Sequence, residues 1–218
     1  MKLYSSIGPN PRLVRMFAAE KGIQLATVEV DIIGGENRQA GFLALNPSGT
    51  TPVLELGDGQ VISETTAICE YLEEVFPSPP LIGTTALQRA QTRMWWRRVD
   101  QAVVQPMTAG FRAAEGFELF KNRVRCYPQS ADQLKLAAGE GLCWLDEQLG
   151  AQTFVCGERL TVVDLLLFCF LEFGAQVGQG LDSGRCVNLA RWHAAMRAPA
   201  SALSYGSGSC SSKTKWCW

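Results

Sequence analysis

The sequence predicts an α/β amino-terminal domain of order βαβ-α-ββα over residues 1–76, followed by an all-α domain over residues 86–205. Three observations lead to this prediction. Short apolar runs in the first third of the chain are separated by Gly, Pro and Asp-Gly turns, which is typical of strands and tight turns. Residues 77–85 are rich in Pro and lack apolar periodicity, which indicates a linker. Beyond them, apolar residues recur at spacings of three and four, as in packed helices.

The first half of the α/β domain is a strand, a crossover helix and a second strand. The strands are expected over Lys2 to Ser5 and Ala26 to Asp31, and the helix over Pro11 to Lys21, where it begins with proline and ends before a glycine. A helix that connects two neighbouring strands in this way makes them parallel. A short helix over Arg38 to Leu45 follows, and the resulting order is that of a thioredoxin-like domain.

The segment from Asn46 to Leu72, NPSGTTPVLELGDGQVISETTAICEYL, completes this domain and carries its candidate binding site. Asp58-Gly59 predicts a hairpin turn between two short strands, and Glu64 opens a helical pattern. Pro52 forces Thr51 into an extended conformation, so Thr51 presents its peptide groups as the edge of a sheet does. Such a backbone can pair with a peptide-like ligand.

Glu64 and Thr65 stand at the predicted start of the helix that follows. N–H groups and a hydroxyl at a helix N-terminus favour a carboxylate, while the Glu64 carboxylate can receive an ammonium group. Taken alone, the two residues are also explained by an ordinary helix start. Together with Thr51 they predict a site for a small zwitterionic peptide.

The pattern NP-x-G-x-x-P-V-L followed by S-E-T-T-A-I-x-E-Y-L resembles the glutathione site of the cytosolic glutathione transferases, whose amino-terminal domain has a thioredoxin-like fold. The resemblance implies glutathione as cosubstrate, held by Thr51, Pro52, Glu64 and Thr65, with a cis peptide bond before the proline. Arg38 is a further candidate, for the glycine carboxylate of glutathione, although a lone arginine on a short polar helix is often only solvated.

The helical domain is expected to contain long helices over Ala86 to Met107, Ser130 to Leu149 and Thr161 to about Ala175. Thr161 as N-cap and Asp164 three residues later form a predicted capping box, which also resembles the transferase family. The helix that it opens is apolar nearly all round and should occupy the centre of the domain. Residues 206–218 are rich in Ser and Gly and predict a disordered tail.

The residue that activates the glutathione sulfur is not defined by a family pattern. Gly8 stands where the serine-type classes have serine, and Asn10 stands where the beta class has cysteine. The Pro9-Asn10 pair most resembles the nu class, in which an Asn donates to the sulfur and the activity includes disulfide reduction. The alternative for Asn10 is a cap on the helix that begins at Pro11. The candidates, in order, are Asn10, then Ser5 and Ser6, then Tyr4.

Composition excludes several other classes of function. Twenty basic and twenty-one acidic residues nearly cancel, so neither nucleic acid nor an anionic membrane is an expected partner. His193 is the only histidine, which leaves no multi-histidine metal site, and no metal is expected. The first residues contain no apolar segment of signal-peptide length, so a cytoplasmic location is expected. The eight cysteines are predicted to be mainly buried free thiols.

The resemblance implies a glutathione S-transferase of the detoxifying type that conjugates or reduces small hydrophobic electrophiles and forms a homodimer. Its electrophile pocket is expected near Phe111, Arg112 and Phe117. Two alternatives are a glutathione-dependent disulfide reductase of the nu type and a non-catalytic interaction module. The motif GG-x-x-x-x-x-x-F-L-A-L-NP is also similar to the zeta-class isomerases, but their S-S-C motif is absent, so isomerase activity is not predicted.

Overall fold

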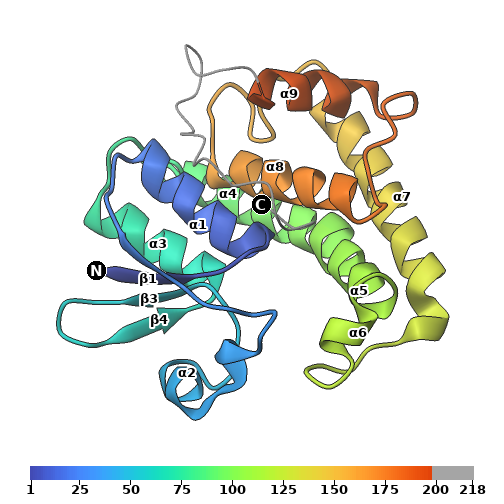
Figure 1. The fold of residues 1–218 in the computed structure, drawn as a ribbon. Coiled ribbons are helices and arrows are strands. Elements are labelled where there is room, and N and C mark those ends of the chain that lie inside the picture. The colour runs from blue at the N-terminus through green and yellow to red at the C-terminus, as the bar shows by residue number, and fades with distance from the viewer. Residues whose placement is uncertain (198–218) are drawn as a thin grey trace. The chain divides into compact units, whose positions relative to one another are not determined.

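A computed structural model describes residues 1–197 (Figure 1). The chain divides into two compact units, Met1–Ile82 and a second unit that begins at Gly83. The predicted fold class is confirmed, because the first unit is a four-stranded mixed sheet with helices in the thioredoxin-like order and the second contains helices throughout. The predicted tail, residues 206–218, lies outside the described residues.

The first unit follows the predicted order of elements. These elements are β1 (Lys2–Ser5), α1 (Pro9–Glu20), β2 (Ala26–Glu29), the 3-10 turn η1 (Glu36–Arg38), α2 (Ala40–Leu45), β3 (Val53–Glu55), β4 (Val61–Ser63) and α3 (Thr65–Val75). The sheet has the order β2-β1-β3-β4, with β1 parallel to β2 and antiparallel to β3, and β3 antiparallel to β4. The crossover helix α1 therefore connects a parallel pair, as predicted.

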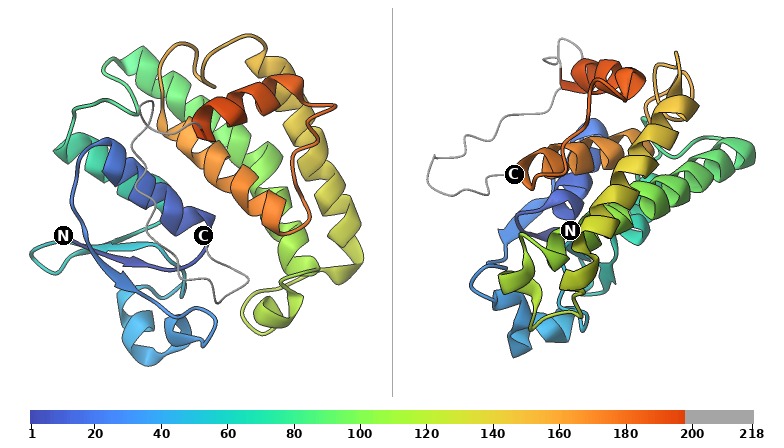
Figure 2. Two further views of the ribbon diagram at one scale, coloured as in Figure 1. Left: turned by 45° about the horizontal axis from the view of Figure 1, so that its top comes forward. Right: turned by 90° about the vertical axis from the view of Figure 1, so that its right-hand side faces the viewer.

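The two faces of this sheet are covered by different helices. Strand alternation places the paired Leu3 and Leu54 on one face and the paired Tyr4 and Val53 on the other. Phe42 of α2 packs with Val53 and Tyr4, so α2 covers the second face. Helices α1 and α3 lie side by side over the first face, where Leu3 and Leu54 are fully buried (Figures 1 and 2).

Three predicted boundaries in the first unit were wrong. Helix α1 begins at Pro9 and not at Pro11, because Gly8 adopts the N-cap position with φ 123° and proline tolerates the first helical turn. The helix predicted over residues 38–45 is divided, since Gln39 is extended and separates η1 from α2. Strand β2 ends at Glu29, and Asp31 instead accepts the Gly34 N–H in a turn at 2.8 Å.

The second unit is built of helices of very different length. They are α4 (Ala86–Val99), the π-helical turn η2 (Asp100–Val104), α5 (Gln105–Ala113), α6 (Phe117–Phe120), the 3-10 turn η3 (Pro128–Ser130), α7 (Ala131–Leu149), α8 (Val162–Gln176) and α9 (Val187–Arg197). The first predicted helix, over Ala86 to Met107, continues through η2 into α5. No helix among residues 1–197 combines the length and apolar character needed to cross a membrane.

Helix α8 forms the core of the second unit, as its sequence predicted. Twelve of its fifteen residues are buried, including the whole run from Val162 to Leu171. Helix α4 packs against α8, and α7 packs against both α5 and α9. A helix that is apolar on all sides needs neighbouring helices around it to remove its side chains from water.

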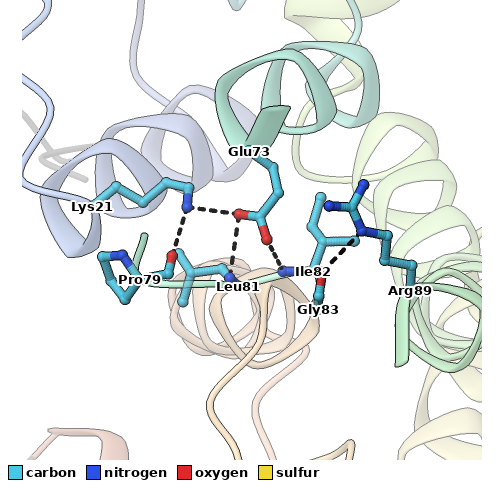
Figure 3. Close-up of polar contacts among 7 residues, drawn as sticks. All are labelled: Lys21, Glu73, Pro79, Leu81, Ile82, Gly83 and Arg89. Atoms are coloured by element: carbon cyan, nitrogen blue, oxygen red, sulfur yellow. Dashed lines mark hydrogen bonds and ion pairs between the residues drawn. The ribbon is translucent and has the colours of Figure 1, made fainter. Parts of the chain in front are cut away.

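The predicted linker contains no helix or strand, but its first half is fixed to the first unit by a buried ion pair (Figure 3). Lys21 Nζ lies 2.7 Å from Glu73 Oε2 and also donates to the Pro79 carbonyl at 2.6 Å. The Glu73 carboxylate accepts the N–H groups of Leu81 and Ile82 at 3.2 and 2.8 Å. The side chains of Lys21 and Glu73 are 0% and 3% exposed, so each charge depends on these partners for its solvation.

We expect the substitution Glu73→Gln to lower the free energy of unfolding by about 3–5 kcal/mol, because it leaves the Lys21 ammonium buried without its counter-charge. Denaturant titration measures this loss. The matched control is Glu74→Gln at the next position, which is exposed and should change the free energy by less than about 0.5 kcal/mol. Equal unfolding midpoints for the two variants would contradict the role given to the ion pair.

The capping box predicted at the start of α8 is present. Asp164 Oδ2 accepts the N–H and the hydroxyl of Thr161, both at 2.9 Å. Asp164 Oδ1 accepts the Val155 N–H at 2.8 Å and the Trp192 indole N–H at 3.3 Å. Burial raises the pKa of Asp164 to about 6, because desolvation of the carboxylate outweighs the four donors that favour its ionised form.

The raised pKa predicts how stability changes with pH. The folded protein binds the Asp164 proton more tightly than the unfolded chain, so this contribution to stability is full below pH 4 and is lost as pH rises through about 6. The stability difference between the unmutated protein and Asp164→Asn should therefore be larger at pH 4 than at pH 7, by roughly 2 kcal/mol. Unfolding titrations at the two pH values measure it, and an unchanged or reversed difference would show that the four donors keep the carboxylate ionised.

Candidate functional site

The register of the sheet brings Thr51, Ser6 and Glu64 to the same edge of the sheet. Val53 at the start of β3 pairs with Tyr4 of β1 on one side and with Ser63 of β4 on the other. The residues just before β3 therefore lie between those that follow β1 and those that follow β4. Contact is direct at one point, since Ser6 Oγ and Thr51 Oγ1 are 2.5 Å apart.

The loop that leads into β3 is held by buried amide side chains. Asn37 Nδ2 donates to the Gly49 carbonyl at 2.6 Å, and Asn46 Nδ2 donates to the Thr50 carbonyl at 2.8 Å. Both asparagine residues are buried. The Thr51-Pro52 peptide bond that follows is cis, as the family resemblance implied. The two asparagines fix the loop that presents Thr51, and a role for Asn37 was not predicted.

Arg38 lies against the same loop. Its Nη1 donates to the Ser48 carbonyl at 3.3 Å, and the guanidinium packs against Gly49, where an added Cβ would come within 2.8 Å of Nη1. Its Nε is buried and has no hydrogen-bond partner within the described chain. A guanidinium in this position keeps donor capacity beside the loop that carries Thr51.

Glu64 is held in an uncommon backbone conformation at the start of α3. It occupies the N-cap position with φ 71° and ψ 124°, and it is the one non-glycine residue among residues 1–197 with a positive φ. A conformation of this kind costs about 1–3 kcal/mol and is typical of functional sites. The Glu64 side chain is exposed, and Thr65 next to it begins the helix, whose first N–H groups lack partners within the helix.

The two serines after β1 are engaged in holding the loop. Ser5 Oγ accepts from the Arg15 guanidinium, while Ser6 Oγ contacts Thr51 and donates to the Ile7 carbonyl at 3.1 Å. Both side chains are buried, at 0% and 1% exposure. These contacts favour a structural role for both hydroxyls.

Tyr4 points its hydroxyl along the sheet and away from the edge that carries Thr51. The hydroxyl donates to Glu55 Oε2 at 2.7 Å, and Lys2 Nζ lies 3.1 Å from the same oxygen. The hydrogen bond to Glu55 is the main reason that the pKa of Tyr4 is raised above its usual value. A tyrosine with this partner is a poor donor to a thiolate elsewhere, which places Tyr4 last among the candidates.

Asn10 is positioned differently from the other candidates. The cap of α1 is Gly8, so the alternative interpretation of Asn10 as N-cap was wrong. Asn10 is exposed in the first helical turn between Pro9 and Pro11, which have no N–H, and the Arg12 N–H is directed to the Gly8 carbonyl at 3.4 Å. Asn10 is therefore the first-turn residue that can offer both a backbone and a side-chain donor.

Two of the three residues expected near an electrophile pocket, Phe111 and Arg112, belong to an aromatic cluster of the second unit. The Phe111 ring lies 6.0 Å from that of Phe120 and 5.0 Å from that of Phe173, and the Arg112 guanidinium lies 5.1 Å from the Phe120 ring. A separate groove of about 610 Å³ lies between α5 and α7 and includes Trp144 in its lining, but none of the three predicted residues. Within residues 1–197 no cluster of three His, Cys, Asp or Glu side chains is suited to hold a metal.

Comparison with known proteins agrees with this geometry. Residues 7–75 match the model of the glutathione S-transferase N-terminal domain, and residues 117–199 match that of the C-terminal domain. Among curated proteins, the chain is 32% identical to Glutathione S-transferase 2 of Saccharomyces cerevisiae over 87% of this chain and 82% of the relative. It is 30% identical to a maleylacetoacetate isomerase of Pseudomonas aeruginosa over 90% of this chain and 94% of the relative.

Solved structures lead to the same family. A glutathione S-transferase domain-containing protein from Marinobacter aquaeolei superposes with a TM-score of 0.85 at 35% identity, covering 92% of this chain and 99% of that chain. Gtt2 from Saccharomyces cerevisiae superposes with a TM-score of 0.84 at 30% identity, covering 92% and 98%. The sheet edge with its cis-proline, the capped central helix and these similarities agree, and the chain belongs to the glutathione S-transferase family.

Proposed function

We propose that this chain binds glutathione at the sheet edge formed by Thr51, Pro52, Glu64 and Thr65, and that it conjugates or reduces small hydrophobic electrophiles. The observation that carries the proposal is the meeting of two unusual backbone features at one edge. Thr51, the residue before a cis-proline, lies next to a helix whose N-cap, Glu64, has a positive φ. Each feature presents peptide or charged groups to the same small volume.

Glutathione is a peptide with charges at both ends, and the groups at this edge are complementary to it. The Thr51 backbone pairs with the peptide as a neighbouring strand would. The exposed Glu64 carboxylate receives the ammonium group, and the Thr65 N–H and hydroxyl at the start of α3 receive the adjacent carboxylate. Arg38 is our candidate for the glycine carboxylate, since this residue is partly exposed and its guanidinium lies beside the loop that leads to Thr51.

Asn10 is our candidate for stabilising the glutathione thiolate. A cysteine thiol has a pKa near 8.5, so a drop of about two pH units needs roughly 2.7 kcal/mol of preferential stabilisation of the thiolate. An amide never titrates, so Asn10 would donate to the sulfur without acting as a base. The first turn of α1 supplies the Asn10 N–H as a second donor, and the helix N-terminus favours negative charge.

A nu-type disulfide reductase is the second candidate function, favoured by the exposed Asn10 beside Pro9. A substrate panel that includes mixed disulfides, hydrophobic halides and a maleylacetoacetate analogue would separate the possible reactions. A non-catalytic module of the same fold would bind glutathione without turnover. The homodimer and the cytoplasmic location remain predictions for this chain.

We expect Glu64→Ala to weaken glutathione binding at least about tenfold, because the charged contact with the ammonium group contributes roughly 1.5–3 kcal/mol. Glu64→Gly should weaken binding similarly, yet be more stable than Glu64→Ala by about 1 kcal/mol, since glycine accepts the positive φ. Calorimetric titration and thermal unfolding measure the two effects. Unchanged affinity in both variants would remove Glu64 from the site, and failure of the unmutated protein to bind millimolar glutathione would overturn the proposed function.

We expect Asn10→Ala to reduce kcat about 10²-fold while KM for glutathione changes little, because a donor to the sulfur stabilises negative charge and adds little to ground-state binding of the thiol. The ultraviolet absorbance of the bound thiolate should fall at neutral pH in the same variant. Ser6→Ala is the comparison, and its effect should appear mainly as lower thermal stability. If Asn10→Ala retains both rate and thiolate absorbance, the thiol is activated by another group.

A further inference from the structure

Two cysteine residues of the second unit have their sulfur atoms in contact. Cys143 Sγ on α7 and Cys186 Sγ, directly before α9, are 3.5 Å apart although the residues are separated by 43 positions in the chain. Both are free thiols. Cys186 is 2% exposed, whereas Cys143 is partly exposed, so a reagent in solution can reach one sulfur more easily than the other.

The backbone around this pair is held by hydrogen bonds that keep the sulfurs together. Asp146, one turn beyond Cys143 on α7, accepts the Leu189 N–H at 2.7 Å and the Asn188 side-chain N–H at 3.0 Å. Asp146 thus caps the first turn of α9 from a neighbouring helix. The Cys186 carbonyl accepts the Ala190 N–H at 2.9 Å, which fixes Cys186 at the start of α9. Approach of the sulfurs is therefore a property of the fold and needs no large movement of either helix.

We propose that Cys143 and Cys186 form a redox-active thiol pair that closes to an intramolecular disulfide when the protein meets a low-molecular-weight disulfide such as glutathione disulfide. This site is separate from the sheet edge proposed to bind glutathione, and the inference does not depend on that proposal. The contact distance, the unequal exposure of the two sulfurs and their fixed backbone are the observations that support it.

The reaction proceeds by two thiol–disulfide exchanges. The Cys143 thiolate attacks one sulfur of glutathione disulfide, breaks its S–S bond, and releases one glutathione thiolate. Cys186 then loses its proton to solvent, its thiolate attacks Cys143 Sγ and breaks the mixed S–S bond, and the second glutathione leaves as a thiolate. Both released thiolates take up protons at neutral pH. Two protein thiols are oxidised and one glutathione disulfide is reduced to two glutathione molecules, so atoms and electrons balance.

The order of these steps follows from the environment of the two sulfurs. Desolvation, followed by the hydrogen bond with Cys143, raises the pKa of Cys186 to about 12. Cys186 therefore carries very little thiolate at neutral pH, which leaves Cys143 as the first sulfur to react. Cys143 is the more accessible sulfur and reacts first, while Cys186 is positioned to resolve the mixed disulfide.

The test is to incubate the full-length protein with glutathione disulfide, block remaining thiols with an alkylating reagent, and map the digest by mass spectrometry without reduction. A peptide pair linked through Cys143 and Cys186, reversible by a dithiol, is expected. The variant Cys186→Ala should instead accumulate a mixed disulfide of glutathione on Cys143, and Cys143→Ser should give neither product. An aromatic disulfide without peptide groups should give the same link in the unmutated protein.

The matched control is Cys126→Ser, because Cys126 is also partly exposed but lies outside the pair, and this variant should still form the link. Two results would overturn the proposal. One is complete alkylation of both Cys143 and Cys186 after prolonged exposure to the oxidant. The other is a link from either residue to a different cysteine in place of the expected pair.

Discussion

The conformation of Glu64 is the constraint on which the candidate site depends. A side chain with a Cβ disfavours a positive φ, and the cost is accepted here because strand β4 ends at Ser63 while α3 must begin at Thr65. The pairing of Val53 with Ser63 fixes the position of the turn between β4 and α3. Because Thr51 lies two residues before Val53, the same pairing places Thr51 beside this turn. The sheet register thus determines which residue adopts the strained conformation, and the side chain of that residue is exposed.

Polar residues around this edge fall into two groups. Some hold the local structure through hydrogen bonds, and others are exposed and can contact a ligand. Four polar residues are buried and form hydrogen bonds to neighbouring loops or to α1. They are Asn37, Asn46, Ser5 and Ser6. Asn10 is exposed and lies in a helical turn with two prolines. Its side chain makes no such hydrogen bond within the described chain. A buried hydroxyl with satisfied partners would have to break them to serve a substrate, which costs free energy, whereas an exposed amide donor does not. This contrast is the physical reason for placing Asn10 before the serines.

Local patterns were sufficient for the parts of the structure that depend on neighbours in sequence. The capping box of Thr161 and Asp164 and the hairpin at Asp58-Gly59 were predictable, because their partners lie within a few residues. The start of α1 was missed because Pro9 and Pro11 fit the first helical turn equally well. Three contacts join separate elements, and the composition of the chain does not indicate which residues pair. These contacts are Asn37 with Gly49, Lys21 with Glu73, and Cys143 with Cys186.

Helix α9 shows how buried carboxylates set the position of an element whose own sequence is only weakly amphipathic. Its apolar residues Leu189, Trp192 and Met196 are buried, but apolar contact alone would tolerate small shifts along the helix axis. Asp146 of α7 binds the first turn, and Asp164 of α8 accepts the Trp192 indole N–H one turn further on. Glu172 of α8 contacts His193 at 2.8 Å. Hydrogen bonds are directional where apolar packing is not, so these three acids define one register for α9. That register is what brings Cys186 against Cys143.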